Sequence, residues 1–217
     1  MTMRIVLVDD QELLRMGFRL VLDSQPDMHV VAEAGNGREA IALVAEHAPD
    51  IVLMDVRMPD VDGVNATRQI IASGSPARII ILTTFDLDEY AYAALRAGAS
   101  GFLLKDAPPT DLLSAIRAVA SGDAVVAPST TRRLLETIAH QLPDPDRDVD
   151  GALTTLTPRE REVAVAVARG LSNAEIAQQL VLAEATVKTH VGRILAKLEL
   201  RDRVQIVVYA YEHDLVA

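Results

Sequence analysis

The sequence has no cysteine, and this absence excludes two kinds of site. Without cysteine among its 217 residues, the chain can form neither a disulfide framework nor a thiolate metal site. Long hydrophobic runs are also missing, since no apolar stretch approaches the roughly 20 residues that a membrane-spanning helix needs. The first residues, MTMRIVLV, lack the layout of a secretory signal. We therefore expect a soluble cytoplasmic protein with no membrane partner.

Positive charge is scarce in only one part of the chain. The net charge is −10, yet from residue 153 onward eight basic side chains balance eight acidic ones. The excess negative charge therefore lies in residues 1–152, which indicates two domains with different partners. Because the overall charge argues against nucleic-acid binding, any case for DNA must come from a local pattern.

The first 122 residues alternate between short apolar runs and helix-length segments. The runs are nearly continuous, which is typical of strands buried on both faces of a parallel sheet. Together they predict an α/β domain with a five-stranded, doubly wound parallel sheet. The expected strands are 5–8, 30–32, 51–54, 79–82 and 102–104, and the expected helices are 12–22, 37–46, 64–72, 87–97 and 111–121.

The rest of the chain divides into a linker, residues 123–152, and a helical domain, residues 153–217. Within the linker, residues 129–142 favour a short helix, whereas PDPDRDVDG at 143–151 is too polar to form a core. Two capping boxes, TPRE and SNAE, mark helix starts in the last domain. We expect four helices there, at about 158–169, 173–180, 184–198 and 201–213.

Polar side chains follow four strands of the predicted sheet, at the point where each strand ends. They are Asp9 and Asp10, Asp55, Thr83 and Lys105. A lone Asp at a strand end is usually a turn residue or a helix cap. Parallel strands, however, bring their carboxyl ends to one edge, so these residues should converge. Adjacent carboxylates repel one another, and a bound Mg²⁺, which prefers such oxygen ligands, would remove that penalty.

The first domain resembles the receiver domain of bacterial response regulators. The motifs VDD, LMDVRMPDVDG, TTF and GFLLKD occur in the expected order and spacing. The resemblance implies that Asp55 is the phosphoacceptor, and that Mg²⁺ is held by Asp9, Asp10, Asp55 and the backbone carbonyl of Arg57. It also implies that Thr83 and Lys105 contact the phosphoryl group and that Phe102 swings inward on activation. A carboxylate nucleophile that forms an acyl phosphate fits this chemistry independently.

The third helix of the last domain is amphipathic, with a basic outer face. Its apolar side consists of Val187, Val191, Ile194, Leu195 and Leu198. Residues 188–203 carry five basic and two acidic groups, and the helix follows a short helix and a tight turn. This arrangement suits insertion into a DNA major groove, although the periodicity fits an ordinary bundle helix equally well.

The segments LTPREREVAVAVARGLSNAEIAQQL and ATVKTHVGRILAKL resemble the LuxR-type helix-turn-helix. With the receiver, this resemblance identifies a NarL/FixJ-type response regulator. It implies DNA contacts from Thr186, Lys188, Thr189, Gly192, Arg193 and Lys197. Of these, Thr186 and Lys197 would lie nearer the DNA backbone. Two departures affect the details of base reading. Ala183 replaces the usual Ser cap of this helix, and Gly192 either permits close approach or removes a contact.

The last predicted helix, residues 201–213, has its own two-sided pattern. Val204, Val207, Val208 and Tyr211 are assigned to the core, which leaves Ile206 and Tyr209 on another face. In the family this helix pairs two DNA-binding domains. The two remaining residues are therefore candidates for a dimer surface, with packing on a neighbouring helix as the alternative.

Together these features predict a DNA-binding transcriptional response regulator of a two-component system. A sensor histidine kinase would phosphorylate Asp55, and the activated homodimer would bind double-stranded promoter DNA. We expect no enzyme activity apart from phosphoryl acceptance and slow self-dephosphorylation at Asp55. One alternative is a Mg²⁺-dependent phosphohydrolase, although such enzymes often carry a second Asp where this chain has Arg57. The other is a regulator that responds to a ligand or partner without phosphorylation.

Overall fold

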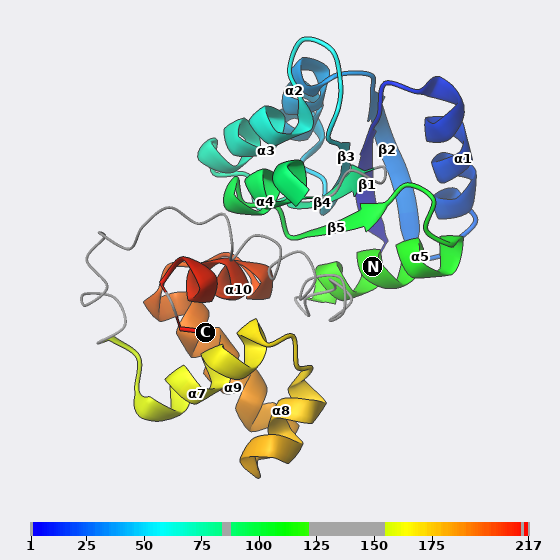
Figure 1. Ribbon diagram of the computed structural model, residues 1–217. Helices are drawn as coiled ribbons and strands as arrows, with labels where there is room; N and C mark the ends of the chain where they lie inside the picture. The colour runs from blue at the N-terminus through cyan, green and yellow to red at the C-terminus, as the bar shows by residue number, and fades with distance from the viewer. Residues whose placement is uncertain (1, 84–87, 122–154, 214, 217) are drawn as a thin grey trace. The chain divides into compact units, whose positions relative to one another are not determined.

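The computed structural model describes residues 2–83, 88–121, 155–213 and 215–216. The chain divides into two compact units, residues 1–125 and 126–217 (Figure 1). The predicted short helix, the acidic linker segment, the last two residues of the TTF motif and the expected domain boundaries lie outside the described residues. Within those residues, every predicted strand and helix is found with both ends within two residues of the expected position.

The first unit is a five-stranded, all-parallel sheet with strand order β2-β1-β3-β4-β5. Its strands are β1 (Met3–Val8), β2 (Met28–Ala34), β3 (Ile51–Asp55), β4 (Arg78–Thr83) and β5 (Gly101–Leu104). Its helices are α1 (Glu12–Asp23), α2 (Gly37–His47), α3 (Gly63–Ala72), α4 (Asp88–Arg96) and α5 (Pro109–Ser121). The predicted doubly wound α/β fold is therefore confirmed.

Helices cover both faces of this sheet, which explains why its central strands are apolar except near their ends. In Figure 1, α1 and α5 lie on one face, while α2, α3 and α4 lie on the other. On the first face, Leu22 of α1 and Ile116 of α5 share one buried cluster with Ile5, Leu53 and Leu82 of the sheet. Because all strands run in one direction, β1, β3, β4 and β5 end at one edge of the sheet.

In the described residues of the second unit, 155–213 and 215–216, four helices pack around one apolar cluster. They are α7 (Pro158–Ala168), α8 (Asn173–Leu180), α9 (Glu184–Lys197) and α10 (Arg203–Glu212). Both predicted capping boxes are present, with Thr157 and Ser172 as the N-caps. Three residues separate α8 from α9, and Ala183 provides no side-chain hydrogen bond at the N-cap of α9, as the sequence indicates.

The predicted orientation of α10 is wrong for Ile206. Its side chain is 0% exposed and belongs to the apolar cluster of its own domain, so it cannot form part of an exposed dimer surface. Tyr209 is half-buried, and its ring stacks on His213 with the centroids 4.0 Å apart. The error arose because α10 carries buried side chains on more than one face, so apolar spacing could not select the face that meets the core.

Within the described residues, no helix is both long and apolar enough to cross a membrane.

Gly63 sits where a larger side chain would strike the backbone of β3. A Cβ atom at this position would lie 2.0 Å from the carbonyl oxygen of Asp55. We predict that Gly63→Ala lowers the free energy of unfolding by about 1–3 kcal/mol, the usual size of an overpacking penalty. Urea unfolding measures the change.

Gly17 provides the matched control, since a Cβ there meets no atom within 4 Å. Gly17→Ala, inside α1, should raise stability by about 0.5–1 kcal/mol, as expected for a helical position. If the two substitutions changed the free energy of unfolding equally, a methyl group at position 63 would not clash with the backbone of β3.

Candidate functional site

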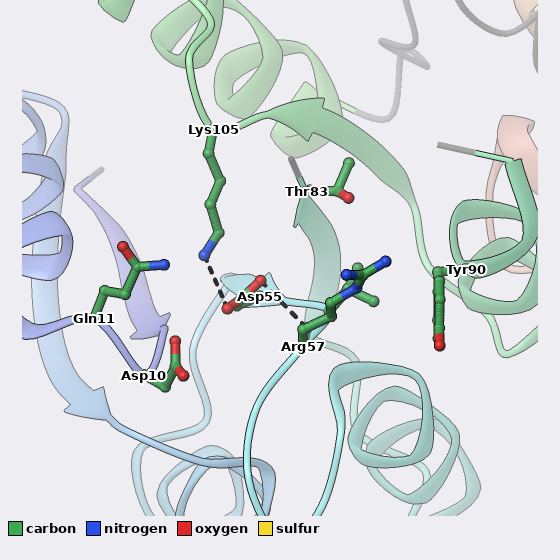
Figure 2. A pocket seen from close by; sticks show the side chains of 8 residues that line it. Asp10, Gln11, Asp55, Arg57, Thr83, Tyr90 and Lys105 are labelled. Atoms are coloured by element: carbon green, nitrogen blue, oxygen red, sulfur yellow. Dashed lines mark hydrogen bonds and ion pairs between the residues drawn. The ribbon is translucent and has the colours of Figure 1, made fainter. Parts of the chain in front are cut away.

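The polar residues predicted at the sheet edge do come together there. Asp55 and Thr83 are the last residues of β3 and β4, Asp9 and Asp10 follow β1, and Lys105 follows β5. A cavity of about 220 Å³ opens at this edge, lined by Asp10, Gln11, Asp55, Val56, Arg57, Thr83, Tyr90 and Lys105. Figure 2 shows Lys105 reaching from the end of β5 to the Asp55 carboxylate, with Asp10 and Gln11 on one side and Arg57 and Tyr90 on the other.

The Lys105 ammonium bridges two buried carboxylates. Its Nζ lies 2.7 Å from Oδ2 of Asp9 and 2.8 Å from Oδ2 of Asp55, and these three side chains are only 7%, 2% and 6% exposed. Burial by itself would lower the pKa of Lys105, but the hydrogen bonds and negative charges of Asp55 and Asp9 outweigh that effect and raise it. Lys105 therefore remains charged at neutral pH, as a buried ion pair requires.

The surroundings of Asp55 disfavour the ionised form of its carboxyl group. Burial raises its pKa, the hydrogen bond and charge of Lys105 act in the opposite direction, and the neighbouring Asp9 adds to the increase. The net shift is upward, so one ammonium does not fully compensate the acidic group. A further cation beside Asp55 would favour its ionised form.

The three carboxylates have the right chemistry and spacing for a divalent cation. One oxygen from each of Asp9, Asp10 and Asp55 lies within 4.8 Å of the others. Asp10 is exposed and lines the cavity, which gives an ion access from solvent. An all-oxygen set with several open positions suits Mg²⁺, which keeps part of its water shell. The residues therefore fit the magnesium ion that the sequence implies.

Backbone hydrogen bonds fix the loops around this cavity. The N–H of Lys105 donates to the carbonyl of Thr83 at 2.7 Å, which ties the end of β5 to the end of β4. The N–H of Gln11 donates to Oδ1 of Asp9 at 2.9 Å, and the N–H of Arg57 donates to Oδ1 of Asp55 at 3.4 Å. These bonds use one oxygen of each carboxylate and leave the other beside Lys105.

The remaining residues predicted in the receiver have different positions. Thr83 is buried and lines the cavity, whereas Phe102 is buried within β5 and is not one of the lining residues. The swing of Phe102 and the metal contact of the Arg57 carbonyl stay predictions. The guanidinium of Arg57 lies over the Tyr90 ring, 5.2 Å from its centroid.

Three lining residues, Gln11, Val56 and Tyr90, were not identified as site residues from the sequence. Gln11 directly follows the acidic pair, so its position in the chain was an available signal. Tyr90 reaches the cavity from α4, and its place depends on how that helix packs. No local pattern in the sequence indicates that contact.

The outer face of α9 is open to solvent, as predicted for a recognition helix. Val187, Val191 and Ile194 are buried on the inner face. The six residues predicted to contact DNA are all exposed: Thr186, Lys188, Thr189, Gly192, Arg193 and Lys197. A Cβ at Gly192 would meet no atom within 4 Å, so this glycine is not required for packing inside the domain.

The basic side chains on this face differ in how they are held. Lys188 pairs loosely with Glu184, one helical turn away, at 3.7 Å, and both side chains are more than half exposed. Such a pair contributes little and breaks easily. Lys197 instead lies 2.6 Å from the buried Glu160 of α7.

Both domains match known families. Residues 5–117 match the response regulator receiver domain, and residues 154–210 match the bacterial regulatory proteins of the luxR family. The uncharacterized transcriptional regulatory protein YxjL of Bacillus subtilis is 43% identical and is aligned over 98% of this chain and 97% of its own length. The response regulator VraR of Staphylococcus aureus is 38% identical over the full length of both chains.

Solved structures give the same result. The response regulator ChrA of a heme-sensing two-component system is 34% identical, with 99% of each chain covered and a TM-score of 0.53. A LuxR-family two-component response regulator from Aurantimonas sp. is 39% identical over 63% of this chain and 97% of its own, with a TM-score of 0.59. With a receiver domain and a LuxR-type domain in one chain, and with relatives that cover all of it, this protein belongs to the LuxR-family transcriptional response regulators of two-component systems.

Proposed function

We propose that a sensor histidine kinase phosphorylates Asp55 and that this modification controls binding of the C-terminal domain to double-stranded promoter DNA. The observation that carries the proposal is the position of the Asp55 carboxylate. It lines a cavity open at the sheet edge, 2.8 Å from the Lys105 ammonium and beside the acidic pair. A nucleophilic carboxylate surrounded by groups that neutralise phosphoryl oxygens is suited to accept a phosphoryl group.

In this reaction, a carboxylate oxygen of Asp55 forms a bond to phosphorus as the P–N bond of the kinase phosphohistidine breaks. The electron pair of that bond leaves with the imidazole nitrogen. Asp9, Asp10, Asp55 and the backbone carbonyl of Arg57 would hold Mg²⁺, which supplies positive charge to the transferring oxygens. The ammonium of Lys105 lies 2.8 Å from Oδ2 of Asp55. After the transfer, it would donate a hydrogen bond to a phosphoryl oxygen instead of to the carboxylate.

The proposed response begins at Thr83. Its side chain lines the same cavity at the end of β4, so its hydroxyl can donate to a phosphoryl oxygen after a small movement. Phe102 of β5 would then turn inward behind it. A local charge change that biases two loop conformations is a common way for phosphorylation to act at a distance. Hydrolysis of the acyl phosphate returns the receiver to its original state.

For the second domain, we propose that α9 enters the major groove of DNA. Lys188, Thr189 and Arg193 lie together on its exposed face and have the donors needed for phosphates or base edges. The DNA-bound form would be a homodimer that reads two half-sites. Tyr209 remains the candidate on α10 for pairing the domains. Because promoter DNA is the target, we propose a cytoplasmic location.

Removing the Asp55 carboxylate should abolish phosphorylation. We predict that Asp55→Asn loses Mg²⁺-dependent labelling by acetyl phosphate, because an amide is a poor nucleophile and lacks the negative charge. Intact-protein mass spectrometry detects the added phosphoryl group. Asp60→Asn, the same change at an exposed position five residues away, should be labelled like the wild type. Stoichiometric labelling of the Asp55 variant would contradict the assignment.

Removing a phosphate contact should change how DNA affinity depends on salt. We predict that Lys188→Ala weakens binding and reduces the slope of log affinity against log salt by about 0.9. Fluorescence anisotropy at several salt concentrations measures this slope. Arg38→Ala removes the same charge from an exposed position in the receiver and should leave the slope unchanged. An equal slope for Lys188→Ala and wild type would exclude the contact.

A further inference from the structure

Lys197, on the recognition helix α9, is held by a buried acid on a different helix. Its Nζ lies 2.6 Å from Oε2 of Glu160 and donates to the carbonyl of Thr155 at 3.1 Å. Glu160 is only 2% exposed, although it carries a charge. The same Oε2 accepts the backbone N–H of Thr157 at 2.8 Å, so this carboxylate also forms the capping box of α7.

The buried carboxylate depends on these donors. The hydrogen bond from Lys197 and then the backbone N–H of Thr157 lower the pKa of Glu160 to about 2, so it is ionised at neutral pH. A buried charge that loses its ionic partner destabilises the fold, and the remaining backbone N–H of Thr157 carries no full charge to replace that partner. If Lys197 turned toward a DNA phosphate, Glu160 would be left without its cation.

We propose that Lys197 is a positioning residue that fixes the recognition helix against α7, rather than a DNA-phosphate contact. This inference rests on the proposed function of α9 in DNA binding. It revises the role that the sequence resemblance implies for Lys197. Lys188 and Arg193 keep their proposed contacts, since neither has a buried acidic partner of this kind among the residues that the structure describes.

The location of the pair explains why the helix needs it. Buried apolar side chains, including Val163 of α7 and Ile194 of α9, hold the two helices together. Apolar contacts are not directional, whereas an ion pair with a fixed acceptor restricts rotation of one helix against the other. Lys197 is one turn beyond Arg193 on α9, so a rotation at its end would displace the side chains proposed to touch DNA.

The pair also includes the chain segment that enters the domain. Thr155 precedes the N-cap of α7, and its carbonyl accepts from the same ammonium. Lys197 therefore joins three elements: this entering segment, the start of α7 and the last turn of α9. Each would lose a polar contact if the ammonium were removed.

The test compares full-length variants on DNA that the acetyl-phosphate-treated wild type selects from a random-sequence duplex pool. We expect Lys197→Met to weaken binding by roughly tenfold at every salt concentration, the size expected when strongly coupled residues are separated. Its salt slope should equal that of the wild type. Lys188→Ala, the matched control, should instead lower the slope by about 0.9.

Glu160 gives the second arm, because it is buried in the domain and cannot itself attract DNA. Glu160→Gln should also weaken DNA binding, and the double variant Glu160→Gln/Lys197→Met should be no weaker than the worse single variant. Lys197→Arg retains a cation at this position and should restore most of the affinity. Urea unfolding of the same variants should show the same non-additivity.

The opposite pattern would overturn the inference. A phosphate contact predicts a lower salt slope for Lys197→Met, together with unchanged or tighter binding for Glu160→Gln, which releases the ammonium. If Lys197→Met does not fold, the Glu160→Gln and Lys197→Arg results still decide between the two roles. Failure of the DNA-binding proposal itself is recognised separately, because Lys188→Ala and Arg193→Ala would then leave affinity and slope unchanged.

Discussion

The receiver site depends on one buried positive charge, the Lys105 ammonium between Asp9 and Asp55. Three acidic side chains at the end of a parallel sheet, two of them buried, would otherwise repel one another. The ammonium offsets part of that repulsion and leaves the pKa of Asp55 raised. Because Lys105 offsets only part of the negative charge of the three carboxylates, a bound cation would stabilise the site further. The site with its cation could then accept a phosphoryl group.

A similar constraint operates in the DNA-binding domain, with a different result. Glu160 is buried and ionised, so it holds Lys197 in a fixed position on α9. Lys188, in contrast, pairs loosely with the exposed Glu184 at 3.7 Å. Burial of the partner thus distinguishes the lysine that we propose to position the helix from the one that we propose to contact DNA. Each domain thus contains a lysine whose position is set by a buried carboxylate: Lys105 beside Asp9 and Asp55 in the receiver, and Lys197 beside Glu160 in the DNA-binding domain.

Much of this could be predicted from the sequence because the signals are local. Continuous apolar runs indicated the parallel strands, and the parallel order then brought Asp9, Asp55 and Lys105 to one edge. Capping boxes fixed the starts of α7 and α8. The missed features depend on tertiary packing. Tyr90 reaches the cavity because of how α4 is placed. The ion pair between Lys197 and Glu160 joins residues 37 positions apart in the sequence. Ile206 lies on a helix that has buried residues on more than one face.

The most direct test of the account is the stability of the protein as a function of Mg²⁺ concentration. If the acidic residues form one magnesium site, the free energy of unfolding of the wild type should rise by about 1.4 kcal/mol for each tenfold increase above the dissociation constant. Asp10→Asn removes an exposed ligand without touching the Lys105 bridge, and this variant should lose most of that response. A wild type that does not respond to Mg²⁺, or an equal response from the variant, would contradict the account.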